Sequence, residues 1–176
     1  MRTLLASLIT SGGMVALIAF FLPWVAVSCN GNTLGSVSPY ERATGIELTQ
    51  TGPEADVSVQ VGSADTTLAA QPGYWLVLLI AGATLGLGVA ASLRHYSKVQ
   101  QTGALAAATA AIGLTVTLKL GVGETLGIMM PTEAGPGIAL DVSLALGLWL
   151  SIAGYALALS GGIATLVLGG RIGPLD

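Results

Sequence analysis

Charged residues are scarce in this chain, and long stretches contain none at all. Lys, Arg, Asp and Glu make up 9% of the 176 residues, whereas 53% of the residues are hydrophobic. Soluble domains carry about 25% charged residues, so this composition excludes an ordinary water-soluble domain. The uncharged apolar stretches lie at 4–22, 74–93, 103–118 and 142–168. Each one reaches or approaches the roughly 20 apolar residues that a helix needs to cross a membrane.

Helices are the structure that these stretches can form across a bilayer, because the backbone there must satisfy its own hydrogen bonds. We therefore predict an all-α membrane bundle of four transmembrane helices, built as a single integral membrane domain. The expected order is a first helix at 4–24, an outer loop at 25–73, a second helix at 74–93, an inner turn at 94–101, a third helix at 102–120, an outer loop at 121–141, a fourth helix at 142–169 and a tail at 170–176.

Basic residues are few, and their positions predict the orientation, because short loops rich in Lys and Arg stay in the cytoplasm. The side that holds both termini carries four basic residues and one acidic residue: Arg2, Arg94, Lys98, Arg171 and Asp176. The opposite side carries two basic and eight acidic residues, a formal charge of −6: Arg42, Lys119, Glu41, Glu47, Glu54, Asp56, Asp65, Glu124, Glu133 and Asp141. We expect both termini in the cytoplasm of a plasma or inner membrane and acidic loops outside, where nucleic acid does not bind.

Cysteine and histidine each occur once, as Cys29 and His95. A single cysteine excludes an internal disulfide and a thiolate metal cluster. His95 lies in the expected inner turn, so the chain offers no histidine at membrane depth to a haem or pigment. No nucleophile and base stand together either. We therefore predict no catalytic, cofactor-binding or metal-binding residues, and a protein that is not an enzyme.

Cys29 leaves one alternative interpretation of the first helix. Residues 1–28 resemble a secretory signal that ends before a lipid-modified cysteine, with Arg2 as its charged start. The apolar run is longer than the core of such a signal, and Pro23 and Trp24 interrupt the approach to Cys29. We therefore favour a first helix that is retained in the membrane.

Polar residues, glycines and isolated valines dominate the expected first outer loop, and they predict strands. Asp56-Val57-Ser58-Val59-Gln60-Val61 alternates with period two, so Val57, Val59 and Val61 share one face and could form an edge for a partner. A return strand is expected at 66–68, and further strands at 25–27 and 45–48. These segments predict a small extracellular sheet, formed by the first outer loop, that lies on the ends of the helices and needs cover.

Small residues recur at helical spacing in the apolar stretches. Such positions allow helices to pack closely in lipid, where burial of apolar surface does not drive association. The expected helix-packing positions are Gly82 and Gly86 in the second helix and Gly147, Gly154, Ala158, Gly161 and Gly162 in the fourth. Aromatic residues prefer the headgroup level of a membrane, so Trp24, Tyr74 and Trp75 are expected to anchor the outer interface.

A resemblance to a known family rests on residues near the first and fourth helices. Leu22-Pro23-Trp24 is similar to the Leu-Pro-x-Trp region of claudins, and Ser143-Leu144-Ala145-Leu146-Gly147-Leu148-Trp149 with Ser160-Gly161-Gly162 is similar to their fourth helix. With its order of loops, the chain resembles the claudin and peripheral myelin protein superfamily of four-transmembrane proteins. Claudins also carry a Gly-Leu-Trp element and two paired cysteines in the first outer loop, whereas this loop has Cys29 alone and no Trp after Trp24.

The resemblance implies a four-helix scaffold that associates laterally, without the selectivity of a junction. We therefore expect a non-enzymatic membrane protein with a structural role, which self-associates in the bilayer or serves as an accessory subunit of a larger membrane complex. The alternative is a small channel or transport component. In that interpretation Lys119 and Glu124 guard an outer vestibule, and Thr115 and Thr117 line a polar track.

Overall fold

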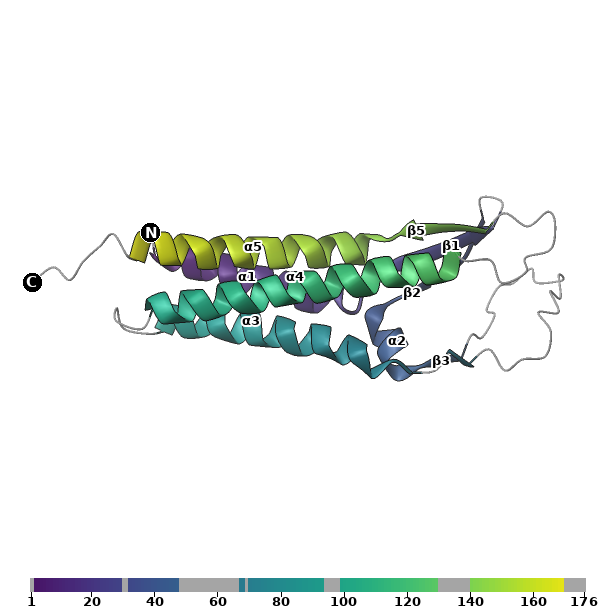
Figure 1. Cartoon of the computed structure of the whole chain (residues 1–176), viewed down its shortest axis with the longest axis horizontal. Coiled ribbons are helices and arrows are strands. Elements are labelled where there is room, and N and C mark those ends of the chain that lie inside the picture. Colours follow the sequence, from purple (N-terminus) through teal and green to yellow (C-terminus); the bar gives the residue numbers. More distant parts are fainter. Residues whose placement is uncertain are drawn as a thin grey trace, which may run out of the picture.

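Four long helices form a bundle, and a small sheet extends from one end of it (Figure 1). The structure, a computed structural model, describes residues 2–29, 32–47, 67–68, 70–93, 99–129 and 140–169. The long helices are α1 (Arg2–Ala19), α3 (Trp75–Leu93), α4 (Val99–Met129) and α5 (Leu146–Gly169). Each packs chiefly against two neighbours, so that the order around the bundle is α1, α5, α4 and α3.

Three segments of these helices are long and apolar enough to cross a membrane: Pro72–Leu93, Gln100–Gly123 and Leu146–Leu168. The first helix contributes a shorter apolar segment, Leu4–Ala19. The described part of the chain therefore has the composition of an integral membrane protein with three candidate spans.

α1 ends at Ala19, five residues before the expected limit at 24, although the apolar sequence continues. The N–H groups of Phe20, Phe21 and Leu22 bond to carbonyl oxygens three residues earlier, so the last turn tightens before Pro23. Proline has no backbone donor and disfavours helix at the residue before it. The chain then enters strand β1 (Val25–Cys29), where a strand was expected.

The main sheet has the order β2-β1-β5 and is antiparallel throughout. β2 is Asn32–Val37, and β5, which is Leu140–Leu144, comes directly before α5. The sheet is therefore not built by the first outer loop alone, as the sequence had suggested, and the fourth helix begins at Leu146 rather than at 142. The sequence of β5 has the pattern of a strand, since Leu140, Val142 and Leu144 alternate with polar residues.

A second, two-stranded sheet pairs β3 (Ile46–Glu47) with β4 (Thr67–Leu68). Both strands lie where short strands were expected. The segment with the clearest strand pattern, which contains Val57, Val59 and Val61, lies outside the described residues.

The third long helix is longer at both ends than the expected 102–120. α4 runs from Val99 to Met129, so the first part of the expected second outer loop is helical. Gly121 and Gly123 each weaken a helix by about 1 kcal/mol, but no proline follows before Pro131 to stop it. A Cβ on Gly121 would lie 2.7 Å from Leu148 Cδ1, so at that position α4 still packs against α5.

A short helix, α2 (Pro39–Thr44), lies at the sheet end of the bundle. Ser38 and Glu41 form a capping box at its start: Ser38 N donates to Glu41 Oε2 at 2.7 Å, and Glu41 N donates to Ser38 Oγ at 3.3 Å. Tyr40 N donates to the Phe20 carbonyl, and Gln71 N donates to the Arg42 carbonyl. These bonds attach α2 both to the end of α1 and to the segment that precedes α3.

The core has two parts along the bundle axis. Near the sheet, a cluster of buried side chains joins the turn after α1, β1, α2, the start of α3, β5 and α5: Phe20, Trp24, Val25, Ala43, Tyr74, Val77, Val142 and Leu148. Further along, the cluster consists of Tyr155 and four alanines: Ala16, Ala81, Ala110 and Ala158. Tyr155 is the large side chain there. Its hydroxyl reaches from α5 to α3 and donates to the Val77 carbonyl at 3.0 Å.

Adding a methyl group at Gly154 should destabilise the bundle. The new Cβ would lie 2.7 Å from the Gly12 carbonyl oxygen and 2.8 Å from Ala16 N, so α1 and α5 must separate. Overpacking of this kind costs about 1–3 kcal/mol. We expect Gly154→Ala to lower the midpoint of thermal unfolding in detergent micelles, followed by circular dichroism. Gly86→Ala is the control, because its Cβ meets nothing within 4 Å. Equal midpoints for the two variants would contradict this account of the packing.

Candidate functional site

The small residues of α5 are used inside the chain. Gly154 and Ala158 meet Gly12 of α1 at backbone contact distance, and a Cβ on Gly162 would lie 2.8 Å from Ala107 N of α4. Gly161 lies against Leu5, Leu8 and Ile9 of α1, and Gly147 lies against the carbonyl oxygens of Leu22 and Pro23. All five positions that the sequence singled out on this helix therefore face neighbouring helices or the turn after α1. None of them is available to a second protein while the bundle is intact.

The two glycines singled out on α3 behave differently. A Cβ placed on Gly82 or on Gly86 would meet nothing within 4 Å. α3 packs instead through Gly88, whose Cβ would lie 2.7 Å from Thr10 N of α1. Gly82 and Gly86 do lie four residues apart on one face of α3, but this face points away from the rest of the bundle.

Gly82 and Gly86 are part of a longer outward seam on α3. Leu79, Gly82, Gly86, Val89 and Leu93 follow one another at separations of three, four, three and four residues. Leu79, Val89 and Leu93 are 66%, 43% and 81% exposed. We call these five residues the open face of α3. Alternation of three and four is the spacing at which one helix packs along another at a small crossing angle.

Four packing glycines of α3 and α4 were not singled out from the sequence: Gly88, Gly103, Gly113 and Gly121. Gly103 lies against Thr165, and Gly113 lies against the ring of Tyr155. Gly113 makes room for the ring of Tyr155, the largest side chain in the middle of the bundle. A signal was present, because Gly103, Gly113 and the buried Ala106 and Ala110 repeat at three to four residues along α4.

Two of the three expected interface anchors are buried. Trp24 is 3% exposed and Tyr74 is 2% exposed, and their ring centroids lie 6.3 Å apart. Trp24 Nε1 donates to the Ala19 carbonyl at 2.9 Å. These two side chains therefore close the core at the sheet end and do not form a belt that faces lipid.

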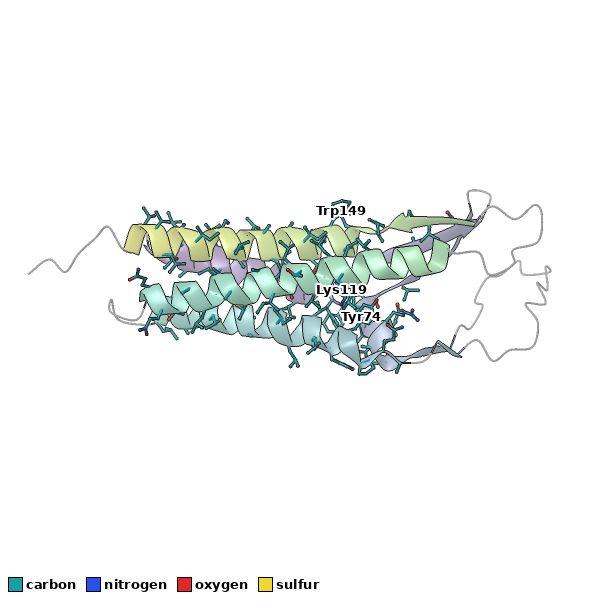
Figure 2. All side chains as sticks on the ribbon, viewed as in Figure 1. Tyr74, Lys119 and Trp149 are labelled. Atoms are coloured by element: carbon teal, nitrogen blue, oxygen red, sulfur yellow. The ribbon has the colours of Figure 1, made fainter. Side chains whose placement is uncertain are left out.

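The exposed aromatic side chains lie elsewhere at the same end. Trp75 is 38% exposed and contacts Phe20 and Tyr40, with ring centroids 6.0 and 6.3 Å apart. Trp149 is 57% exposed, near the start of α5. Figure 2 shows Tyr74, Lys119 and Trp149 towards the end of the bundle from which the sheet extends.

The two threonines considered for a polar track do not face one another. Thr115 is exposed and donates to the Ala111 carbonyl at 2.9 Å, whereas Thr117 is 0% exposed. Successive side chains of an α-helix point about 100° apart, so those of Thr115 and Thr117 point about 200° apart. The two hydroxyls therefore cannot line one path. Lys119 is exposed on α4, and Glu124 lies within the same helix, although its side chain is outside the described set.

Within the described ranges, no group of three or more His, Cys, Asp or Glu side chains could hold a metal ion. Comparison of the chain with protein-family models, with curated proteins and with solved structures finds no match.

Loss of the indole hydrogen bond should weaken the sheet end of the bundle. Trp24→Phe keeps an aromatic ring in the cluster but removes the donor to Ala19, which leaves a buried carbonyl oxygen with one bond fewer. We expect a loss of about 1–2 kcal/mol in the free energy of unfolding, measured by denaturant titration in micelles. Trp149→Phe serves as the control and should unfold like the wild type, because Trp149 is exposed. Wild-type stability in Trp24→Phe would show that the bond contributes nothing.

Proposed function

We propose that this chain is a non-enzymatic, four-helix integral membrane protein with a structural role. It associates laterally in the bilayer through the open face of α3, either with a second copy of itself or as an accessory subunit beside a helix of another membrane protein. The observation that carries the proposal is that Gly82 and Gly86 lie in this face with open space above them.

Ten other helix glycines differ from this pair and support an external contact, whereas Gly123 of α4 is open in the same way. At Gly12, Gly13, Gly88, Gly103, Gly113, Gly121, Gly147, Gly154, Gly161 and Gly162, an added Cβ would come within about 3 Å of a neighbouring element. Glycine weakens a helix relative to alanine, so its use is explained where another backbone comes close. Gly82 and Gly86 have no such neighbour within the chain. A helix from outside, seated between Leu79 and Leu93, supplies it.

The proposal includes α1 as a fourth crossing. Its 18 residues span about 27 Å, close to the thickness of the hydrocarbon core. It packs lengthwise between α3 and α5, with Gly12 against α5 and Gly13 against α3. A helix that packs along two candidate spans in this way shares their depth. With four crossings, the start of α1 and the end of α5 lie at one surface and the sheet lies at the other, in keeping with the ends that Figure 1 shows.

The likeness to the claudin and peripheral myelin protein superfamily is part of this proposal. A strand directly after the first helix, a strand directly before the last and a helical bundle below them support it. The alternative of a small channel has less support, because Thr115 faces outward and Thr117 inward.

Filling the open face should abolish association without unfolding the protein. We expect Gly82→Leu combined with Gly86→Leu to weaken lateral association about tenfold or more, because larger side chains hold the partner helix away. The stability of the bundle should not fall, since both side chains enter open space. The measurements are the mass of the purified complex in mild detergent and energy transfer between labelled chains in vesicles.

The matched control is Ala104→Leu with Ala108→Leu, two exposed small residues four apart on α4. Loss of self-association in the glycine variant alone supports the scaffold. A wild type that is monomeric when pure but co-migrates with another polypeptide from native membranes supports the accessory subunit. If the glycine variant and the wild type associate equally in both assays, the proposed surface is wrong.

The four-crossing topology can be tested with single cysteines. In a Cys29→Ser background, Ser36→Cys on β2 should react with a membrane-impermeant maleimide added outside intact cells. Gln100→Cys, at the start of α4, should react only after permeabilisation, and an epitope tag at the N-terminus should be protected in the same way as Gln100→Cys. If the tag and Ser36→Cys were both accessible from the same side of the membrane, α1 would not cross the membrane.

A further inference from the structure

Two hydroxyl groups in the bundle core have no hydrogen-bond partner among the residues that the structure describes. They belong to Thr117 of α4 and Ser151 of α5, and both residues are 0% exposed. A polar group without a partner is costly in an apolar interior, so nearly all buried polar groups have one. These two hydroxyls therefore require an explanation.

Other hydroxyls on the long helices show what the ordinary solution is. Thr10, Thr84 and Thr165 each donate to the carbonyl oxygen four residues earlier in the same helix, at 2.9, 2.8 and 2.8 Å. Ser92 and Ser160 donate to the carbonyl three residues earlier. Thr84 and Thr165 make these bonds in buried positions. Thr117 and Ser151 do not bond to their own helices, so their hydroxyls are left for a group between helices.

The contacts between α4 and α5 place the two hydroxyls at the same level. Gly113 lies against Tyr155, and Gly121 lies against Leu148, so the two helices run antiparallel in a regular seam. Thr117 is midway between Gly113 and Gly121. Ser151 lies between Leu148 and Tyr155 at the matching point of the other helix. Thr117 and Ser151 therefore oppose one another across this seam.

The chemistry of the pair selects a small neutral ligand. Each hydroxyl can donate one hydrogen bond and accept others, and a buried water molecule needs at least two polar partners. Ser151 is also small beside Leu148 and Tyr155. Two hydroxyls alone do not offset the cost of burying an ion.

We propose that Thr117 Oγ1 and Ser151 Oγ bind one water molecule between α4 and α5. The bridge satisfies both hydroxyls and links the two helices at a single register, because a shift of either helix by one turn separates the pair. The site is independent of the open face of α3 and does not rest on the proposed function.

Radiolytic footprinting tests the site on the full chain in detergent micelles. A brief X-ray pulse converts water to hydroxyl radicals where it is bound, and the radicals oxidise the nearest side chains. Tyr155 and Leu148 are 0% and 2% exposed, so bulk water does not reach them. We expect oxidation of these two residues in the wild type, read by mass spectrometry, and its loss in Thr117→Val and in Ser151→Ala.

Two further variants keep the test decisive. Thr84→Val removes a buried hydroxyl that bonds to its own helix, so oxidation at Tyr155 and Leu148 should be unchanged. Thr117→Ser retains the hydroxyl and should retain the oxidation, even if Thr117→Val does not fold. Absence of oxidation at both residues in the wild type would show that no water is bound between the two hydroxyls. Wild-type oxidation in a folded Ser151→Ala would place the water elsewhere. Either result overturns the proposal.

Discussion

The close approach of α1 and α5 at Gly12 and Gly154 determines how the remaining elements can be arranged. In lipid, helices gain little from burying apolar side chains, and their association depends on packing and hydrogen bonding. At this crossing the two backbones touch, with the place of each Cβ taken by the other helix. Once α1 and α5 are held at this distance, Gly13 brings α3 against α1, and Gly162 brings α4 against α5. The square of helices closes around a narrow centre, in which one tyrosine ring fits only because Gly113 lacks a side chain.

The sheet end is organised by a different interaction. The first backbone donors of a helix have no acceptor within the helix, and at the start of α5 the turn after α1 supplies acceptors. Ala145 N, just before the helix, donates to the Trp24 carbonyl at 2.8 Å, and Gly147 N donates to the Pro23 carbonyl at 2.9 Å. The backbone carbonyls of this turn therefore cap the N-terminus of α5. Trp24, which was expected to face lipid, is held inside because its carbonyl, its N–H and its indole all have partners there.

The parts of the fold that depend on composition could be predicted, and those that depend on direction could not. Long uncharged stretches indicated the helices at 74–93 and near 4–22, and the segment at 25–27 was expected to form a further strand, which is β1. The sequence did not predict which face of each helix points into the bundle, because α3 and α5 are apolar on all sides and have no polar face that would orient them. Gly86 and Gly88 fit a packing pattern equally well in the sequence, yet they point in different directions. β5 was missed because its apolar residues continue directly into those of α5.

β1 occupies the middle of the sheet, between a strand that continues its own hairpin and a strand that leads straight into α5. Pulling α1 and α5 apart at this end would therefore tear a whole ladder of backbone bonds, whereas α3 has no strand in that ladder. The two halves of the bundle are therefore held in different ways. α1 and α5 are joined by the backbone hydrogen bonds of the sheet, whereas α3 is held by side-chain packing and by the short helix α2. The half without a strand in this ladder also carries the open face of α3, so a helix that docks there, as we propose, would not pull on the sheet.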